Sequence, residues 1–296
     1  MTTLAARLHR LRGQAGATDA APERDRNGLG TAPDAASGSS STRPYADPAD
    51  LRAFLRRQLG LRGRGGPMPR TVAPDRRVEG EAITAGLHLS ETLHDAPAAS
   101  GCLDAGFAGQ PPIACTRFLH FDTETTGLAG GTGTRAFMIG AGDWRGGRLR
   151  LRQLTLTTLA AEAEMLRVFA GWIAPDTVLV SYNGKCYDAP LLATRYRLAR
   201  LSNPLPGCLH LDLLHPVRRR WRAIWPNCRL ATAERELLGV LREDDLPGSE
   251  APRAWLDYLR GGSARDLRRV AAHNAQDLRS LAGLLLRLGR EGRRSP

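Results

Sequence analysis

The 296-residue sequence has a single lysine, Lys185, and no apolar run that approaches the ~20 residues of a membrane-spanning helix. Its five cysteines show no Cys-x-x-Cys spacing, which argues against a disulfide framework and against a zinc knuckle. The first residues, MTTLAARLHRLRGQAG, lack the uninterrupted apolar segment of a secretory signal. We therefore expect a protein of the reducing cytoplasm rather than a secreted or membrane protein.

The charge is strongly positive, with a formal net charge of +12 and a pI of about 10.6. Such a balance suits a polyanionic partner such as nucleic acid. Nearly all of this charge is arginine in a chain rich in alanine and glycine, which is typical of a compositional bias. The basicity is therefore only weak support for a nucleic-acid partner.

The composition divides the chain into four parts. Residues 1–75 are rich in Ala, Gly, Ser, Pro and Arg, and we expect a disordered, basic, low-complexity region there. Residues 76–116 carry weak strand signals (EAITAGLHLSETL) and predict an irregular, strand-rich extension. The pattern sharpens over residues 117–290, which we interpret as the folded domain, and residues 291–296 form a short tail.

The folded domain is predicted to be α/β. Three consecutive strand-like runs, RFLHFDT, RAFMIGAGDW and RLRLRQLTLTT, are separated by Gly-rich turns and indicate an antiparallel meander. Helical and strand segments then alternate: LAAEAEMLRVFAGWI, TVLVSY, APLLATRYRLARL and CLHLDLL, with several helices at the end. This order predicts a mixed sheet, three antiparallel strands followed by two parallel strands, flanked by helices.

Four acidic residues stand where the predicted elements end. Asp122 and Glu124 close the first strand, about 6–7 Å apart on one face, where two like charges are costly unless something neutralises them. Asp188 follows the strand TVLVSY, although an ordinary helix cap is an equal alternative there. Asp277 and His273 lie four residues apart on the last helix, so they share one face, but each alone is more typical of an ordinary helix residue. Hard carboxylate ligands without a cysteine motif favour two Mg²⁺ or Mn²⁺ ions, an arrangement used for phosphodiester cleavage.

Several longer sequence motifs, taken in this order, resemble those of a known family. DTETTGL, SYNGKCYD and HNAQD resemble the three motifs of the DEDD 3′–5′ exonucleases of the ribonuclease H-like superfamily. More closely, FDTETTGLAGGTGTRAFMIG, SYNGKCYDAPLLATRYRL, HLDLLHPVRRRWR and HNAQDLRSL resemble the YprB-type ribonuclease H-like domain. The resemblance covers roughly residues 117–290.

The resemblance implies a two-metal nuclease acting on single-stranded or frayed nucleic-acid ends. The family's metal-binding acids carry over onto Asp122, Glu124, Asp188 and Asp277. His273 is the candidate general base, although it stands at the spacing of the family's tyrosine-type members rather than its histidine-type members. A structure-specific endonuclease on the same fold and a non-catalytic nucleic-acid-binding module remain the alternatives.

Further residues are candidates for substrate contacts. Thr125, Gly127 and Leu128 belong to the first motif. Asn183 and Lys185 precede Asp188; Lys185 offers a compact charge for a phosphate, whereas Asn183 is equally typical of a turn. The segment RRRWR could hold a strand by charge and stacking, but a solvated helix face with a buried tryptophan explains it as well.

Overall fold

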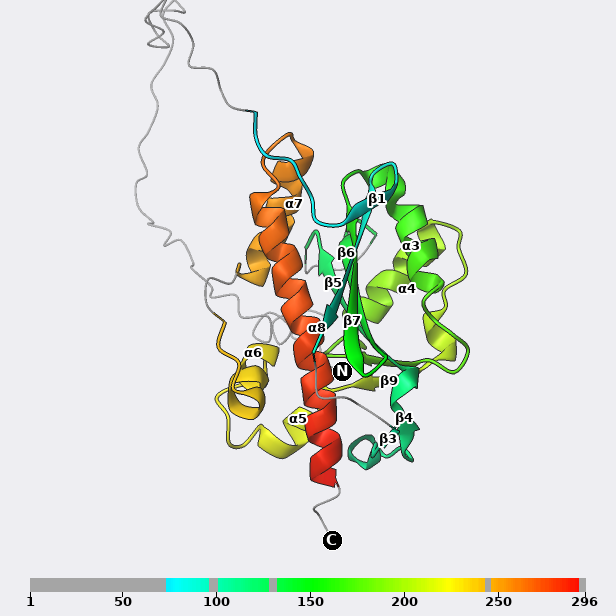
Figure 1. The fold of residues 1–296 in the computed structure, drawn as a ribbon, viewed down its shortest axis with the longest axis vertical. Coiled ribbons are helices and arrows are strands. Elements are labelled where there is room, and N and C mark those ends of the chain that lie inside the picture. The colour runs from blue at the N-terminus through cyan, green and yellow to red at the C-terminus, as the bar shows by residue number, and fades with distance from the viewer. Residues whose placement is uncertain (1–72, 96–100, 128–131, 243–245, 293–296) are drawn as a thin grey trace, which may run out of the picture. The chain divides into compact units, whose positions relative to one another are not determined.

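The computed structural model describes residues 73–95, 101–127, 132–242 and 246–292. The predicted disordered region lies outside the described residues up to position 72, as do Leu128 and the tail from position 293. Within the described part, the chain forms a seven-stranded sheet, a small two-stranded sheet and the helices that cover them (Figure 1).

The large sheet has the strand order β1-β2-β7-β6-β5-β8-β9. Its strands are β1 (Glu81–Thr84), β2 (Leu87–His94), β5 (Phe118–Thr125), β6 (Ala136–Arg145), β7 (Arg148–Leu156), β8 (Val178–Ser181) and β9 (Leu209–Asp212). The predicted mixed sheet is confirmed, because β5, β6 and β7 pair antiparallel whereas β8 and β9 run parallel to β5.

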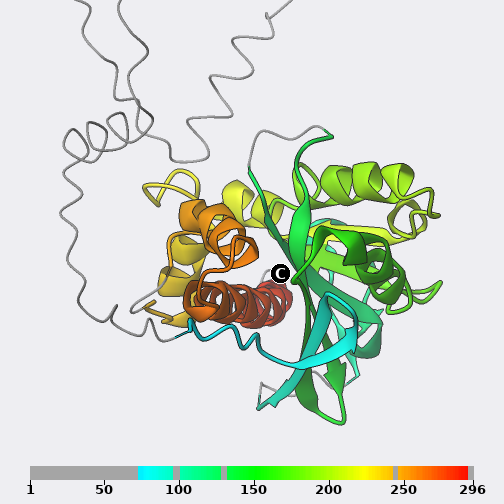
Figure 2. The ribbon, with the colours of Figure 1, turned by 90° about the horizontal axis from the view of Figure 1, so that it is seen from above.

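Helices cover both faces of this sheet. They are α3 (Glu162–Ala170), α4 (Asp188–Leu198), α5 (Leu214–Trp221), α6 (Leu230–Ala233), α7 (Ala251–Leu259) and α8 (Arg265–Gly292). Figure 2 shows α7 and α8, in orange to red, on one side of the sheet and the green helices α3 and α4 on the other. Because central strands covered on both faces must be apolar on both, β6 is buried along nearly its whole length.

Part of the predicted extension belongs to the same sheet. Strand β2 pairs antiparallel with β7 over eight positions, from Leu87 opposite Leu156 to His94 opposite Leu149. The two-stranded sheet of β3 (Cys102–Leu103) and β4 (Ile113–Ala114) contributes to a second apolar cluster with the last turns of α8.

A close approach joins this small sheet to α8. A Cβ added to Gly289 would lie 2.6 Å from Leu103 Cδ1, so only glycine lets the two surfaces come this near. Around this contact, apolar side chains of the extension and of α8 are buried together: Leu103, Phe107, Ile113, Leu281, Leu284, Leu285 and Leu288.

The parallel strands determine where functional side chains gather. Strands β5, β8 and β9 are parallel, so their carboxyl ends lie at the same edge of the sheet. The chain leaves β8 at Ser181 and enters α4 at Asp188, whereas β9 ends at Asp212.

All five cysteines are free thiols. None of the helices between residues 73 and 292 that the structure describes combines the length and the apolar character needed to cross a bilayer.

Candidate active site

The first two predicted acids lie on β5. Asp122 pairs across the sheet with Gly140 of β6, and Glu124 pairs with Met138. Side chains alternate along a strand, so both carboxylates lie on the same face. Glu124 is 8 % exposed and Asp122 is half-buried, so neither charge is fully hydrated.

The structure brings all four predicted acids together around Asp122. Burial raises the pKa of the Asp122 carboxyl well above its usual value, and the nearby negative charges of Asp277, Asp188 and Glu124 raise it further. A hydrogen bond from Asn274 lowers this pKa but does not outweigh the other effects. Carboxylates from β5, α4 and α8 therefore form one electrostatically coupled cluster.

Asp188 faces this cluster from the start of α4. Its side chain is buried and accepts a hydrogen bond from the hydroxyl of Thr123 on β5. Burial raises the pKa of Asp188 to about 6, and the charge of Asp212 adds to the effect, while the Thr123 hydroxyl opposes it. The cap residue of α4 is Tyr187, with no side-chain hydrogen bond, so Asp188 does not serve as an ordinary helix cap.

The loop before Asp188 is held by Asp212, the last residue of β9. The Asp212 carboxylate accepts the backbone N–H of Asn183 at 2.7 Å and that of Lys185 at 3.1 Å. Asn183 has a φ of 67°, a left-handed conformation that asparagine tolerates and that turns the chain sharply. A Cβ at Gly184 would come within 3.1 Å of Asp188 Oδ2. The loop therefore packs tightly against the carboxylate that it presents.

Two residues that no sequence pattern singled out, Asn274 and Gln153, fix the orientation of the Asp122 carboxylate. Asn274 of α8 is fully buried, and its Nδ2 donates to Asp122 Oδ2 at 2.8 Å. Gln153 of β7 donates to Asn274 Oδ1 at 2.9 Å, so the orientation of the Asn274 amide is determined. A Cβ at Gly140 would lie 2.0 Å from Asn274 Oδ1. Gly140 therefore leaves the space through which Asn274 reaches the sheet.

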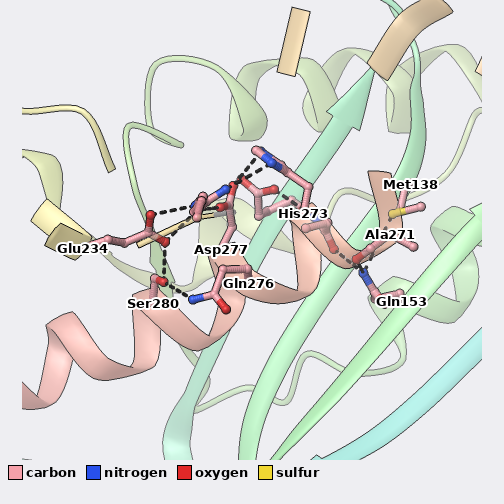
Figure 3. A network of polar contacts seen from close by, with 11 residues as sticks. Met138, Gln153, Glu234, Ala271, His273, Gln276, Asp277 and Ser280 are labelled. Atoms are coloured by element: carbon pink, nitrogen blue, oxygen red, sulfur yellow. Dashed lines mark hydrogen bonds and ion pairs between the residues drawn. The ribbon is translucent and has the colours of Figure 1, made fainter. Parts of the chain in front are cut away.

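A second network surrounds Asp277 (Figure 3). Arg242 donates to Asp277 Oδ1 and makes two hydrogen bonds with Glu234, at 2.6 and 2.7 Å. Glu234 lies in a π-helical turn (Glu234–Leu238), is fully buried, and also accepts a hydrogen bond from Ser280. Burial raises the pKa of Asp277, whereas His273 and Arg242 lower it.

His273 lies between Arg242 and Asp277. Its Nδ1 is 3.1 Å from Arg242 Nη1, and its Nε2 is 3.6 Å from Asp277 Oδ2. A guanidinium group can only donate, so Nδ1 must be the acceptor in this contact and the ring proton is on Nε2. In this arrangement the lone pair that a general base would use is already directed at Arg242.

The predicted substrate residues lie around the same edge of the sheet. Thr125 donates its hydroxyl to Gly127 O at 3.1 Å, which orders the chain just after β5. Asn183 is half-buried and Lys185 is exposed, both in the loop before α4. Leu128 lies outside the described residues. Thr125 and Gly127 thus follow Glu124 directly in the chain, and Asn183 and Lys185 lie in the loop that leads to Asp188.

The RRRWR segment supports the simpler of its two readings. It forms the end of α5, where Trp221 is half-buried and stacks on Trp225, with ring centroids 4.9 Å apart and an interplanar angle of 3°. One face of each indole is therefore covered by the other ring and is not available for a base.

A family model described as the RNase_H superfamily matches residues 119–288. This chain belongs to the RNase H superfamily. The uncharacterized protein YprB of Bacillus subtilis (strain 168) is 36 % identical to it over 172 residues, which cover 58 % of this chain and 41 % of YprB. This RNase H superfamily member thus spans less than half the length of that relative.

Solved structures of exonuclease I are similar in part to this superfamily member. A product-bound exonuclease I has a TM-score of 0.36 and 16 % identity, over 53 % of this chain and 46 % of that one. E. coli exonuclease I with a dT13 oligonucleotide has a TM-score of 0.37 and 15 % identity, over 52 % and 45 %. The family assignment does not depend on these partial likenesses.

The donor chemistry of this RNase H superfamily site fits divalent ions. Carboxylate oxygens are the ligands that Mg²⁺ and Mn²⁺ prefer, and buried carboxylates whose pKa is raised by one another are the groups that a cation would stabilise. Among the described residues, however, no group of three or more Asp, Glu, His or Cys side chains already surrounds a point where an ion could sit. Asn274, Thr123 and Arg242 each hold one oxygen of a different carboxylate, so ion binding requires small side-chain movements.

Proposed function

We propose that this chain is a divalent-metal-dependent nuclease that acts as a 3′–5′ exonuclease on single-stranded or frayed ends of DNA or RNA. The observation that carries the proposal is the convergence of four acids in one place: the carboxylates of Glu124, Asp188 and Asp277 all lie close enough to Asp122 to raise its pKa. Membership of the RNase H superfamily supports the same reaction class.

The four acids would hold two Mg²⁺ or Mn²⁺ ions. Bound ions would supply an activated water and would stabilise the oxygen that leaves the phosphate. Residues of the chain would orient the carboxylates and contact the substrate. Asn274 holds one oxygen of Asp122 and leaves the other for coordination, and Thr123 does the same for Asp188. Lys185, exposed in the loop before Asp188, would contact a phosphate of the substrate.

His273 stays in the proposed catalytic set because it contacts Asp277. Its role as the base that takes the proton from water is a prediction from the sequence, and the hydrogen bond from Arg242 to Nδ1 counts against it. The alternative is that Nε2–H of His273 donates to Asp277 and that the ions alone acidify the water.

A direct assay tests the proposed function. The full chain is incubated with 5′-labelled single-stranded DNA or RNA, with Mg²⁺, with Mn²⁺ or with EDTA. We expect a ladder of products that requires a metal and disappears with Asp122→Asn; a 3′-phosphorothioate end should slow it if the polarity is 3′–5′. The matched control is Asp176→Asn, which changes an exposed aspartate of a surface ion pair.

Each alternative outcome has a meaning. A few discrete products would replace the exonuclease by a structure-specific endonuclease. Binding of the oligonucleotide without cleavage in any metal would leave a non-catalytic nucleic-acid-binding module and overturn the proposal.

A further inference from the structure

Arg242 is the feature that the proposed reaction leaves unexplained. Its guanidinium group donates to Asp277, one of the four clustered acids, and its side chain is only 14 % exposed. A surface arginine would lose its partner readily to water, but this one lies where solvent competes little. Its partners therefore determine its position.

Glu234 is the anchor of Arg242. The Glu234 carboxylate is fully buried, accepts the bidentate fork of the guanidinium, and receives the hydroxyl of Ser280 as well. Ser280 in turn accepts a hydrogen bond from Gln276 at 3.0 Å. A buried carboxylate with this many fixed donors holds a guanidinium in one orientation, because the two planar groups match at two points.

The outer edge of the anchored guanidinium then faces α8. Nη2 donates to Asp277 Oδ1 and Nη1 donates to His273 Nδ1. The second contact works only if Nδ1 carries no proton, which places the ring proton on Nε2, toward Asp277 Oδ2. Arg242 thus holds one oxygen of Asp277 directly and directs the Nε2–H of the imidazole toward the other oxygen, 3.6 Å away.

We propose that Arg242, anchored on Glu234, is a positioning residue that sets the orientation of the Asp277 carboxylate and the tautomer of His273. Arg242 touches neither the substrate nor the reacting atoms in this role. It prepares the ligand face of α8 and keeps the Nε2–H of His273 directed toward Asp277. The kinetic part of this inference rests on the proposed function, whereas its structural part does not.

The tautomer gives a readout that is independent of catalysis. Protein containing ¹⁵N-labelled histidine, without added metal, is studied by a long-range proton–nitrogen correlation experiment, and the His273 ring is assigned by its loss in His273→Gln. We expect a single Nε2–H form in the wild type. Arg242→Gln should lose this single form and show exchange between tautomers.

A matched control lies in the same segment. Arg235 follows Glu234 directly, is about half exposed, and pairs with its neighbour Glu236 at 3.0 Å. Arg235→Gln should keep the wild-type His273 spectrum. If Arg242→Gln fails to fold because Glu234 is left unpaired, the double variant Arg242→Gln/Glu234→Gln removes the buried charge and allows the same measurement.

The kinetic arm uses the oligonucleotide assay with Mg²⁺. We expect Arg242→Gln to lower kcat about 10–100-fold, the usual range for a group that orients a metal ligand, with KM changed less than about threefold. Arg242→Lys should recover only part of this loss, because an ammonium group cannot form the fork. Arg235→Gln should differ from the wild type by less than about twofold.

The outcomes separate this inference from the proposed function. A wild-type His273 ring with the proton on Nδ1, or a spectrum that Arg242→Gln leaves unchanged, overturns the positioning role whatever the activity. A wild type without cleavage in any metal overturns the proposed function, while the spectra still decide about Arg242.

Discussion

The cost of burying a charge in the acid cluster should be measurable as stability, and Asp188 is the residue at which to measure it. Asp188→Asn removes the charge but keeps an oxygen that can accept the Thr123 hydroxyl. Burial raises the pKa of Asp188 from 3.8 to about 6. Each unit of pKa corresponds to ~1.4 kcal/mol, so the ionised form costs the folded protein about 3 kcal/mol.

The sign of this effect fixes its pH dependence. The pKa is raised in the folded state, so the folded carboxyl group holds its proton more tightly than the unfolded one. Well below the unfolded pKa of 3.8 the group is protonated in both states and costs nothing; the cost grows between this pKa and the folded pKa of about 6, and is fully present above it. We expect Asp188→Asn to be more stable than the wild type by about 3 kcal/mol at pH 7 and by only about 0.5 kcal/mol at pH 4.

Urea unfolding with EDTA, at pH 7 and at pH 4, measures this difference. Added Mg²⁺ should stabilise the wild type more than Asp188→Asn, because the variant has lost a ligand. The control Glu164→Gln alters an exposed i,i+3 ion pair and should shift stability by less than ~0.5 kcal/mol. A variant that gains nothing at pH 7, or gains as much at pH 4, would show that charge in the cluster is not the cause.

Three further outcomes follow from the structure. Gly140→Ala should lower the free energy of unfolding in urea by ~1–3 kcal/mol and should weaken cleavage, because the new methyl group overlaps Asn274. The control Gly142→Ala, where the nearest atom is 3.1 Å away, should lower it less, and equal losses would contradict this explanation. His273→Ala should reduce cleavage less than tenfold with an unchanged pH–rate profile, whereas a loss of ~10²–10⁴-fold would identify it as the base. Asp212→Ala leaves three backbone N–H groups without their acceptor, the buried one of Leu214 and the partly buried ones of Asn183 and Lys185. The buried group alone costs on the order of 1–3 kcal/mol, so the variant should unfold at lower urea; a midpoint within error of the wild type would refute the role of Asp212 in the loop.

The strands and the acids were accessible from the sequence because their signals are local. An apolar run that ends in Asp122 and Glu124 identifies β5, and the four-residue spacing of His273 and Asp277 identifies a shared helix face. The weak strand signals before residue 95 also correspond to β1 and β2. Their place at the edge of the sheet, next to β7, depends on pairing between distant segments and has no local signal.

The residues that orient the acids were not identified because their roles depend on contacts across the fold. Gln153 meets Asn274 across 121 positions of the sequence, and Arg242 meets Asp277 across 35. Asn274 belongs to the motif HNAQD, but the motif does not indicate that the amide of Asn274 contacts Asp122 on β5. Glu234 lies in a segment without helical periodicity, so its burial could not be inferred from the sequence.

The apolar contact between α8 and the small β3–β4 sheet has a practical consequence for how the chain can be divided for expression. A fragment that begins at residue 117 follows the predicted domain boundary, but it lacks the β3–β4 sheet. Its loss would expose leucines of α8 to solvent: Leu281, Leu284, Leu285 and Leu288. A newly bared leucine stripe of this kind promotes self-association and low soluble yield. The minimal soluble fragment should therefore start before β1, near Arg76, whose side chain donates to Tyr258 O and Gly262 O beside α7.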